Sequence, residues 1–206
     1  MAQNNVSKDA TVASYTQKGY GELIVYALIF ISLVAAIFAF NIILSNKSRE
    51  DTLRIYCATH QQRSWQRALK NLEQARIALF TMAPVKKPFG EFSNSINSFN
   101  LYVTTLVYGG QISIDGQMVD VHPPEDEKTL EVINDLNRVW ATGKTDMLRL
   151  ASEVKTGKVD TLLMEQMLEY AVREDDRVLD ACQEFIVKLG QQSDERGTEL
   201  QTFQVG

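Results

Sequence analysis

The chain has few of the residues that carry enzyme chemistry. Its 206 residues include two cysteines and two histidines, and no phosphate-binding glycine loop, nucleophile elbow or zinc-type cluster. His60 and His122 belong to different predicted elements, so a metal site would need the fold to bring both together with a carboxylate. The net charge of -5 disfavours a nucleic-acid partner. We therefore expect no enzyme activity, no cofactor and no metal, and a membrane-bound enzyme is the least favoured alternative.

Charge is absent from one long stretch. The apolar run from Leu23 to Leu44, LIVYALIFISLVAAIFAFNIIL, contains no Asp, Glu, Lys or Arg. As a helix its 22 residues would span roughly 33 Å, enough for the ~30 Å hydrocarbon core of a bilayer. A secretory signal peptide has a shorter apolar stretch and ends in a small-residue cleavage site. The run predicts a retained transmembrane helix, preceded by a flexible tail over residues 1–22.

Proline and glycine are scarce beyond this run. Neither occurs from Ser45 to Met82, so the transmembrane helix is expected to continue directly into the first helix of a domain that covers residues 45–206. Further helices are expected at about residues 91–108, 125–155 and 159–203. Gly157 is expected to close the helix at 125–155. Each has one apolar stripe, which predicts an all-α fold: an antiparallel four-helix bundle. The segment near residues 112–121 alternates in polarity around Asp115 and Gly116, and we expect a small β-hairpin or a loop there.

The two cysteines are predicted to be unpaired and buried. Cys57 and Cys182 stand at different heights of the expected bundle, farther apart than the ~7 Å between Cα atoms that a disulfide allows. A free cysteine behaves as a small apolar core residue.

The segment CATHQQRSWQRALKNL, from Cys57 to Leu72, contains the candidate ligand-binding residues. Arg63 and Arg67 are four residues apart and share one helix face, with Gln62 and Gln66 beside them. This face lies nearly opposite Trp65, and therefore points away from the core stripe of the same helix. One interpretation is a pair of solvent-exposed arginines paired with nearby acids. The other is that guanidinium groups from two copies of the chain converge on an anion at a two-fold axis.

The same segment resembles a known family. QQRSWQRAL is similar to the GxQRMxSQR-type segment of PilJ-type domains, the N-terminal sensors of type IV pilus chemotaxis transducers, which in turn are similar to the periplasmic domain of nitrate/nitrite sensor kinases. LYVTTLVYGG and HPPEDEKTLEVINDLNRVW resemble later parts of the family pattern. The match covers about residues 56–154. Only Gln66 and Arg67 fit the central Gln-Arg pair of the family; its earlier arginine falls nearer Gln62, with Arg63 one position away.

The resemblance implies a periplasmic sensor bundle, anchored in the bacterial inner membrane by one span of this chain, that works as a homodimer and binds a small anion by arginine. The flanking charges favour the opposite orientation mildly, because Lys47, Arg49 and Arg54 follow the span whereas Lys8 and Lys18 are balanced by acids. We give the resemblance precedence over this charge signal.

Family members usually return through the membrane to a cytoplasmic output module. This chain ends on TELQTFQVG, so it is either a fragment cut before a second span or a single-span protein. We expect a sensory bundle that relays the binding of a small ligand or a protein partner across the membrane. The alternative is a non-catalytic accessory or scaffold subunit of an inner-membrane assembly.

Overall fold

The computed structural model describes the backbone of residues 6–153 and 159–205. Within these residues the chain is mostly helical, with four helices and a two-stranded antiparallel sheet. It divides into two compact units, Met1–Lys47 and Ser48–Gly206. We call the second the helical unit. The predicted closure of the third helix at Gly157 lies outside the described residues.

Helix α1 (Val6–Phe80) contains the whole apolar run. Its large apolar side chains from Leu23 to Ile43 are 42–71% exposed. An uncovered apolar surface of this length is favourable in lipid and unfavourable in water. The helix is long and apolar enough to cross a membrane, so residues 23–44 form a candidate membrane span.

A flexible tail was expected over residues 1–22, but α1 begins at Val6. The sequence there is polar and lacks an apolar stripe, which is why a tail was predicted. It also lacks proline, and extending an existing helix avoids the unfavourable nucleation step. Residues 6–22 are therefore helical.

Helix α2 (Lys86–Tyr108) begins five positions before the predicted start near Glu91. The predicted start places Pro88 and Gly90, residue types that often end helices, before the helix. Pro88 instead lies in the first turn, where its missing N–H would have had no partner within the helix. α2 ends at Gly109, whose positive φ of 79° suits glycine.

The hairpin expected near residues 112–121 is confirmed. Strands β1 (Gly110–Ile114) and β2 (Gln117–Val121) pair in antiparallel register, with Gly110 opposite Val121. Asp115 and Gly116 join them with φ values of 52° and 80°. Positive φ at both central residues is typical of the two-residue turn that matches strand twist.

The last two helices begin at acidic caps. Asp126 precedes α3 (Glu127–Glu153) and accepts a hydrogen bond from the backbone N–H of Thr129 at 2.8 Å. Asp160 precedes α4 (Thr161–Val205) and accepts one from the N–H of Leu163 at 3.0 Å. Each carboxylate satisfies an N–H that the helix leaves unpaired.

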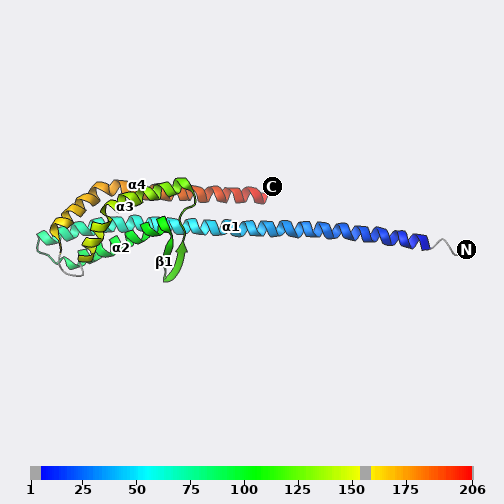
Figure 1. Ribbon diagram of the computed structural model, residues 1–206, viewed down its shortest axis with the longest axis horizontal. Helices are drawn as coiled ribbons and strands as arrows, with labels where there is room; N and C mark the ends of the chain where they lie inside the picture. The colour runs from blue at the N-terminus through cyan, green and yellow to red at the C-terminus, as the bar shows by residue number, and fades with distance from the viewer. Residues whose placement is uncertain (1–5, 154–158, 206) are drawn as a thin grey trace. The chain divides into compact units, whose positions relative to one another are not determined.

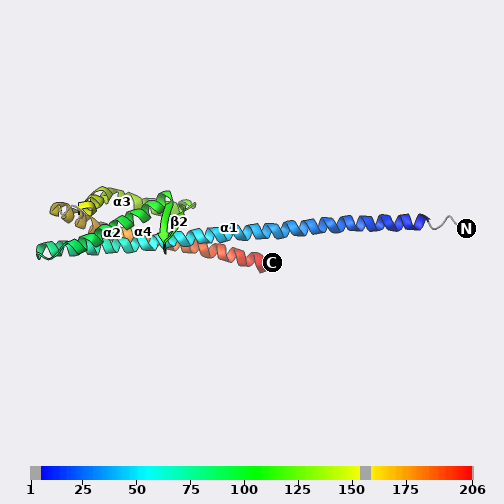
Figure 2. The same ribbon diagram turned by 90° about the horizontal axis from the view of Figure 1, so that it is seen from below.

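In the helical unit parts of all four helices lie side by side (Figures 1 and 2). The core contains side chains from each of them. Trp65 of α1 contacts Phe99 of α2, with ring centroids 5.1 Å apart, and Phe99 contacts Trp140 of α3 at 5.0 Å. The Trp65 indole N–H donates to Asp175 of α4 at 2.8 Å. Further contacts connect α2 to α3 and α3 to α4.

Helices α3 and α4 pack closely at Gly143. A Cβ atom added at Gly143 would lie 2.3 Å from the ring of Tyr170. The Tyr170 hydroxyl donates to the carbonyl of Val139 at 2.7 Å, which fixes the ring against α3. Glycine is thus required at position 143 by packing.

Candidate functional site

The four predicted ligand-binding residues lie on α1 within the helical unit. Arg63, Gln66 and Arg67 are exposed and Gln62 is partly buried. Trp65, on the same turn, is buried in the core. The arginines therefore face away from the core of their own chain.

Arg63 and Arg67 have no acidic partner among the described residues. Carboxylates do pair with other arginines of the helical unit, namely Arg54, Arg76, Arg138, Arg149, Arg173 and Arg177. An arginine offers five N–H donors in a planar fork that fits a carboxylate or another planar anion. In a chain with more acidic than basic residues, two unpaired guanidinium groups on one helix face leave a local positive charge.

His60 lies one turn before Arg63, and the positive charges of the two arginines affect its pKa. Its ring contacts those of Tyr56 and Tyr102 in tilted arrangements, with centroid distances of 4.1 and 5.7 Å. Burial lowers the pKa of His60 below its ordinary value of 6.5, and the positive charges of Arg63 and Arg67 lower it further. The imidazole is therefore biased toward its neutral form.

An open pocket of about 430 Å³, lined by polar and charged residues, lies between α1 and α2 beside Arg67. Its other lining residues are Lys70, Asn71, Glu91, Asn94 and Ser95. We call it the α1–α2 cavity. Of the four predicted residues only Arg67 lines it; Gln62, Arg63 and Gln66 do not.

Sequence reasoning missed the other lining residues of the α1–α2 cavity. Lys70 could have been found, because it lies three residues after Arg67 on the same face. The α2 residues follow only from the pairing of the helices, which the contact between Trp65 and Phe99 fixes.

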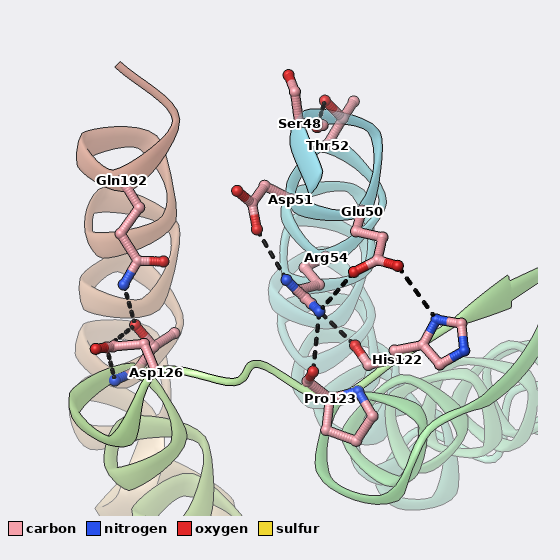
Figure 3. Close-up of polar contacts among 10 residues, drawn as sticks. Ser48, Glu50, Asp51, Thr52, Arg54, His122, Pro123, Asp126 and Gln192 are labelled. Atoms are coloured by element: carbon pink, nitrogen blue, oxygen red, sulfur yellow. Dashed lines mark hydrogen bonds and ion pairs between the residues drawn. The ribbon is translucent and has the colours of Figure 1, made fainter. Parts of the chain in front are cut away.

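A second polar cluster lies where the helical unit begins (Figure 3). Arg54 is 6% exposed and donates to Asp51 at 2.8 Å and to Glu50 at 3.2 Å. It also donates to the backbone carbonyls of His122 and Pro123, each at 2.9 Å. We call these five residues the Arg54 cluster. It fastens the start of the helical unit to the loop between β2 and α3.

The loop is in turn connected to α4. The Thr129 hydroxyl donates to Asp126 at 2.8 Å, and the Gln192 amide donates to the Thr129 hydroxyl at 3.0 Å (Figure 3). The hydrogen bonds from Thr129 hold the pKa of the Asp126 carboxyl below its usual value. Polar contacts thus run from α1 through the loop to α4.

One buried amide has no partner among the described residues. Gln61 is fully buried, and neither its Oε1 nor its Nε2 makes a hydrogen bond. An unpaired buried amide is unfavourable, so Gln61 is expected to lower the stability of the helical unit.

The remaining candidates for reactive chemistry are the two cysteines and any group of side chains that could bind a metal ion. Both cysteines are free and buried, as predicted, and burial raises the pKa of each thiol to about 12. A protonated thiol is a weak nucleophile. Within residues 6–153 and 159–205, no group of three His, Cys, Asp or Glu side chains could hold a metal ion.

Comparison with known proteins identifies no relative: no family model, curated protein or solved structure matches this chain.

Proposed function

We propose that this chain is a membrane-anchored sensory protein whose helical unit binds a small charged ligand and relays the binding across the membrane. In this proposal the helical unit is an antiparallel four-helix bundle on the periplasmic side of a bacterial inner membrane, and two copies form a homodimer. Residues 23–44 form the span.

The observation that carries the proposal is the pair of unpaired arginines. Arg63 and Arg67 are exposed, lack an acidic partner among the described residues, and adjoin the α1–α2 cavity through Arg67. An acidic protein gains no stability from leaving two guanidinium groups without a carboxylate, whereas a ligand-binding face needs donors that are not already used.

The Arg54 cluster supports the relay. It occupies the part of α1 that follows the candidate span in sequence, and it joins that part to the loop that precedes α3. A ligand moves a conformational equilibrium only by binding one state more tightly than the other. A shift of α1 against this loop is the change that we expect to differ between the states.

The resemblance to PilJ-type sensor domains supports the dimer and the orientation, through Gln66 and Arg67. It also suggests a link to type IV pilus chemotaxis. The one-position offset of Arg63 from the family pattern makes Arg67 the residue to test first.

A scaffold or accessory subunit is the second candidate. It is favoured by exposed apolar side chains where α1 ends: Phe80 is 78% and Met82 96% exposed. Exposed apolar groups of this size are frequent where another protein docks. A scaffold would bind a protein through this end and would need no small ligand.

Thermal unfolding separates the two candidates. The full chain in detergent is heated with and without millimolar nitrate, nitrite, acetate, phosphate or an amino acid. A ligand at 100 times its dissociation constant adds about 2.7 kcal/mol to the free energy of unfolding, a rise of roughly 5–11 °C for a domain of this size.

The sensory proposal expects one such rise, its loss in Arg67→Gln, and its retention in Lys87→Gln, a matched control on an exposed cation outside the cavity. A midpoint that no compound moves would favour the scaffold.

A further inference from the structure

We propose that the α1–α2 cavity binds a small zwitterion, a molecule with one carboxylate and one ammonium group, within a single protomer. This inference rests on the proposed function and names the ligand class of its site. The cavity, of about 430 Å³, is of the size that small-molecule sites have.

The first argument is the number of unused polar groups in its wall. Arg67, Lys70 and Glu91 make no ion pair or hydrogen bond through their charged groups to the described residues. The amide of Asn71, which also lines the cavity, makes no hydrogen bond to them either, and is therefore available to a ligand.

The second argument is the arrangement of charge. Two cations, Arg67 and Lys70, come from α1, and one carboxylate, Glu91, comes from α2. They line the same cavity without closing on one another as ion pairs. A simple anion would be repelled by Glu91, and a simple cation by Arg67 and Lys70. A zwitterion can place its carboxylate near Arg67 and Lys70 and its ammonium group near Glu91.

The third argument is the hydrogen-bonding capacity near each wall. Arg67 and Lys70 can only donate, which suits a carboxylate. The Ser95 hydroxyl already donates to the backbone carbonyl of Glu91 at 2.8 Å. Its oxygen is left as an acceptor and, with the Glu91 carboxylate, suits the three donors of an ammonium group. The charged donors thus lie on α1 and the charged acceptor lies on α2.

The cavity differs from an anion site shared between two copies because Arg63 does not line it. An anion bound by converging arginines on the exposed face would involve both Arg63 and Arg67. The α1–α2 cavity involves Arg67 alone. Arg63 therefore distinguishes the two sites.

Isothermal titration calorimetry on the full chain in detergent tests the inference. The probes are alanine as a zwitterion, glutamate and arginine as amino acids with one additional charge, acetate as a carboxylate alone, methylammonium as an amine alone, and nitrate as a small anion. At least one amino acid should bind, and acetate and methylammonium should bind at least about tenfold more weakly, because each lacks one charged contact.

Three variants localise the binding. Arg67→Gln and Glu91→Gln should each lower the affinity for the amino acid by about tenfold or more. Glu91→Gln should also raise the affinity for acetate, because it removes the repulsive charge. Lys87→Gln, on an exposed cation outside the cavity, is the control and should leave the amino acid affinity unchanged. All three residues are exposed, so the variants are expected to fold, which thermal unfolding verifies.

Two outcomes would overturn the inference in different ways. If nitrate or acetate binds more tightly than every amino acid, ignores Glu91→Gln and is lost in Arg63→Gln, the zwitterion site is wrong while ligand sensing stands. If none of the probes binds, the zwitterion site is wrong and the sensory function loses its support as well.

Discussion

Replacing Arg54 by methionine should destabilise the helical unit strongly. The substitution keeps the apolar stem but removes the guanidinium group, which is 6% exposed and donates to two carboxylates and two backbone carbonyls. Asp51, 1% exposed, would lose this counter-charge. Removing one partner of a buried ion pair costs about 3–5 kcal/mol. For a domain of this size that lowers the unfolding midpoint by roughly 6–20 °C.

Tryptophan fluorescence is the appropriate assay. Both tryptophans of the chain, Trp65 and Trp140, are buried in the helical unit, so the signal excludes the candidate span. Arg63→Met is the matched control, because Arg63 is an exposed arginine on the same helix and its loss should change stability by at most ~0.5 kcal/mol. Equal midpoints for the two variants would show that Arg54 does not fasten α1 to the β2–α3 loop.

Four further predictions concern the core and the arginine face. Gly143→Ala should destabilise by about 1–3 kcal/mol through overpacking, whereas Gly190→Ala, with nothing within 4 Å of the new Cβ, should stabilise by up to ~1 kcal/mol; the same sign for both in urea unfolding would refute the α3–α4 packing. Gln61→Leu should stabilise by about 1 kcal/mol or more, because it removes an unpaired buried amide, and a destabilised variant in the same assay would indicate a partner for that amide. Arg67→Gln should raise the pKa of His60 in an NMR titration, since it removes a positive charge. The lowered pKa of His60 also predicts that its contribution to the free energy of unfolding is complete above pH 6.5 and is lost as pH falls below it, because the unfolded chain binds the proton first; wild-type stability that does not depend more steeply on pH in this range than that of His60→Gln would contradict this.

The local features of the fold could be predicted because they depend on neighbouring residues. The uncharged run from Leu23 to Leu44 is sufficient to indicate a candidate span, and Asp115 and Gly116 are sufficient to indicate the hairpin turn. The start of α2 was missed because Pro88 has opposite meanings at a helix end and in a first turn. The helical residues 6–22 were missed because helix propagation does not need an apolar stripe.

The candidate site was predictable only in part. Helical spacing places Arg63 and Arg67 on one exposed face, because both lie on the same helix. It cannot show that Glu91 and Ser95 line a cavity with Arg67, since that depends on the pairing of α1 with α2. The Arg54 cluster was missed for the same reason: two of its acceptors are backbone carbonyls of a loop 68 and 69 residues away in sequence.

The central claim is that the arginine face of α1 binds a charged ligand, and the ring of His60 tests it most directly. With only two histidines in the chain, both imidazoles can be followed by NMR after ¹⁵N-histidine labelling. His60 is titrated with and without the compound that most stabilises the protein in the unfolding experiment. We predict that a carboxylate or other anionic group bound at Arg67 raises the pKa of His60. A His60 pKa that the compound does not move would show that it binds away from this face, and would contradict the account.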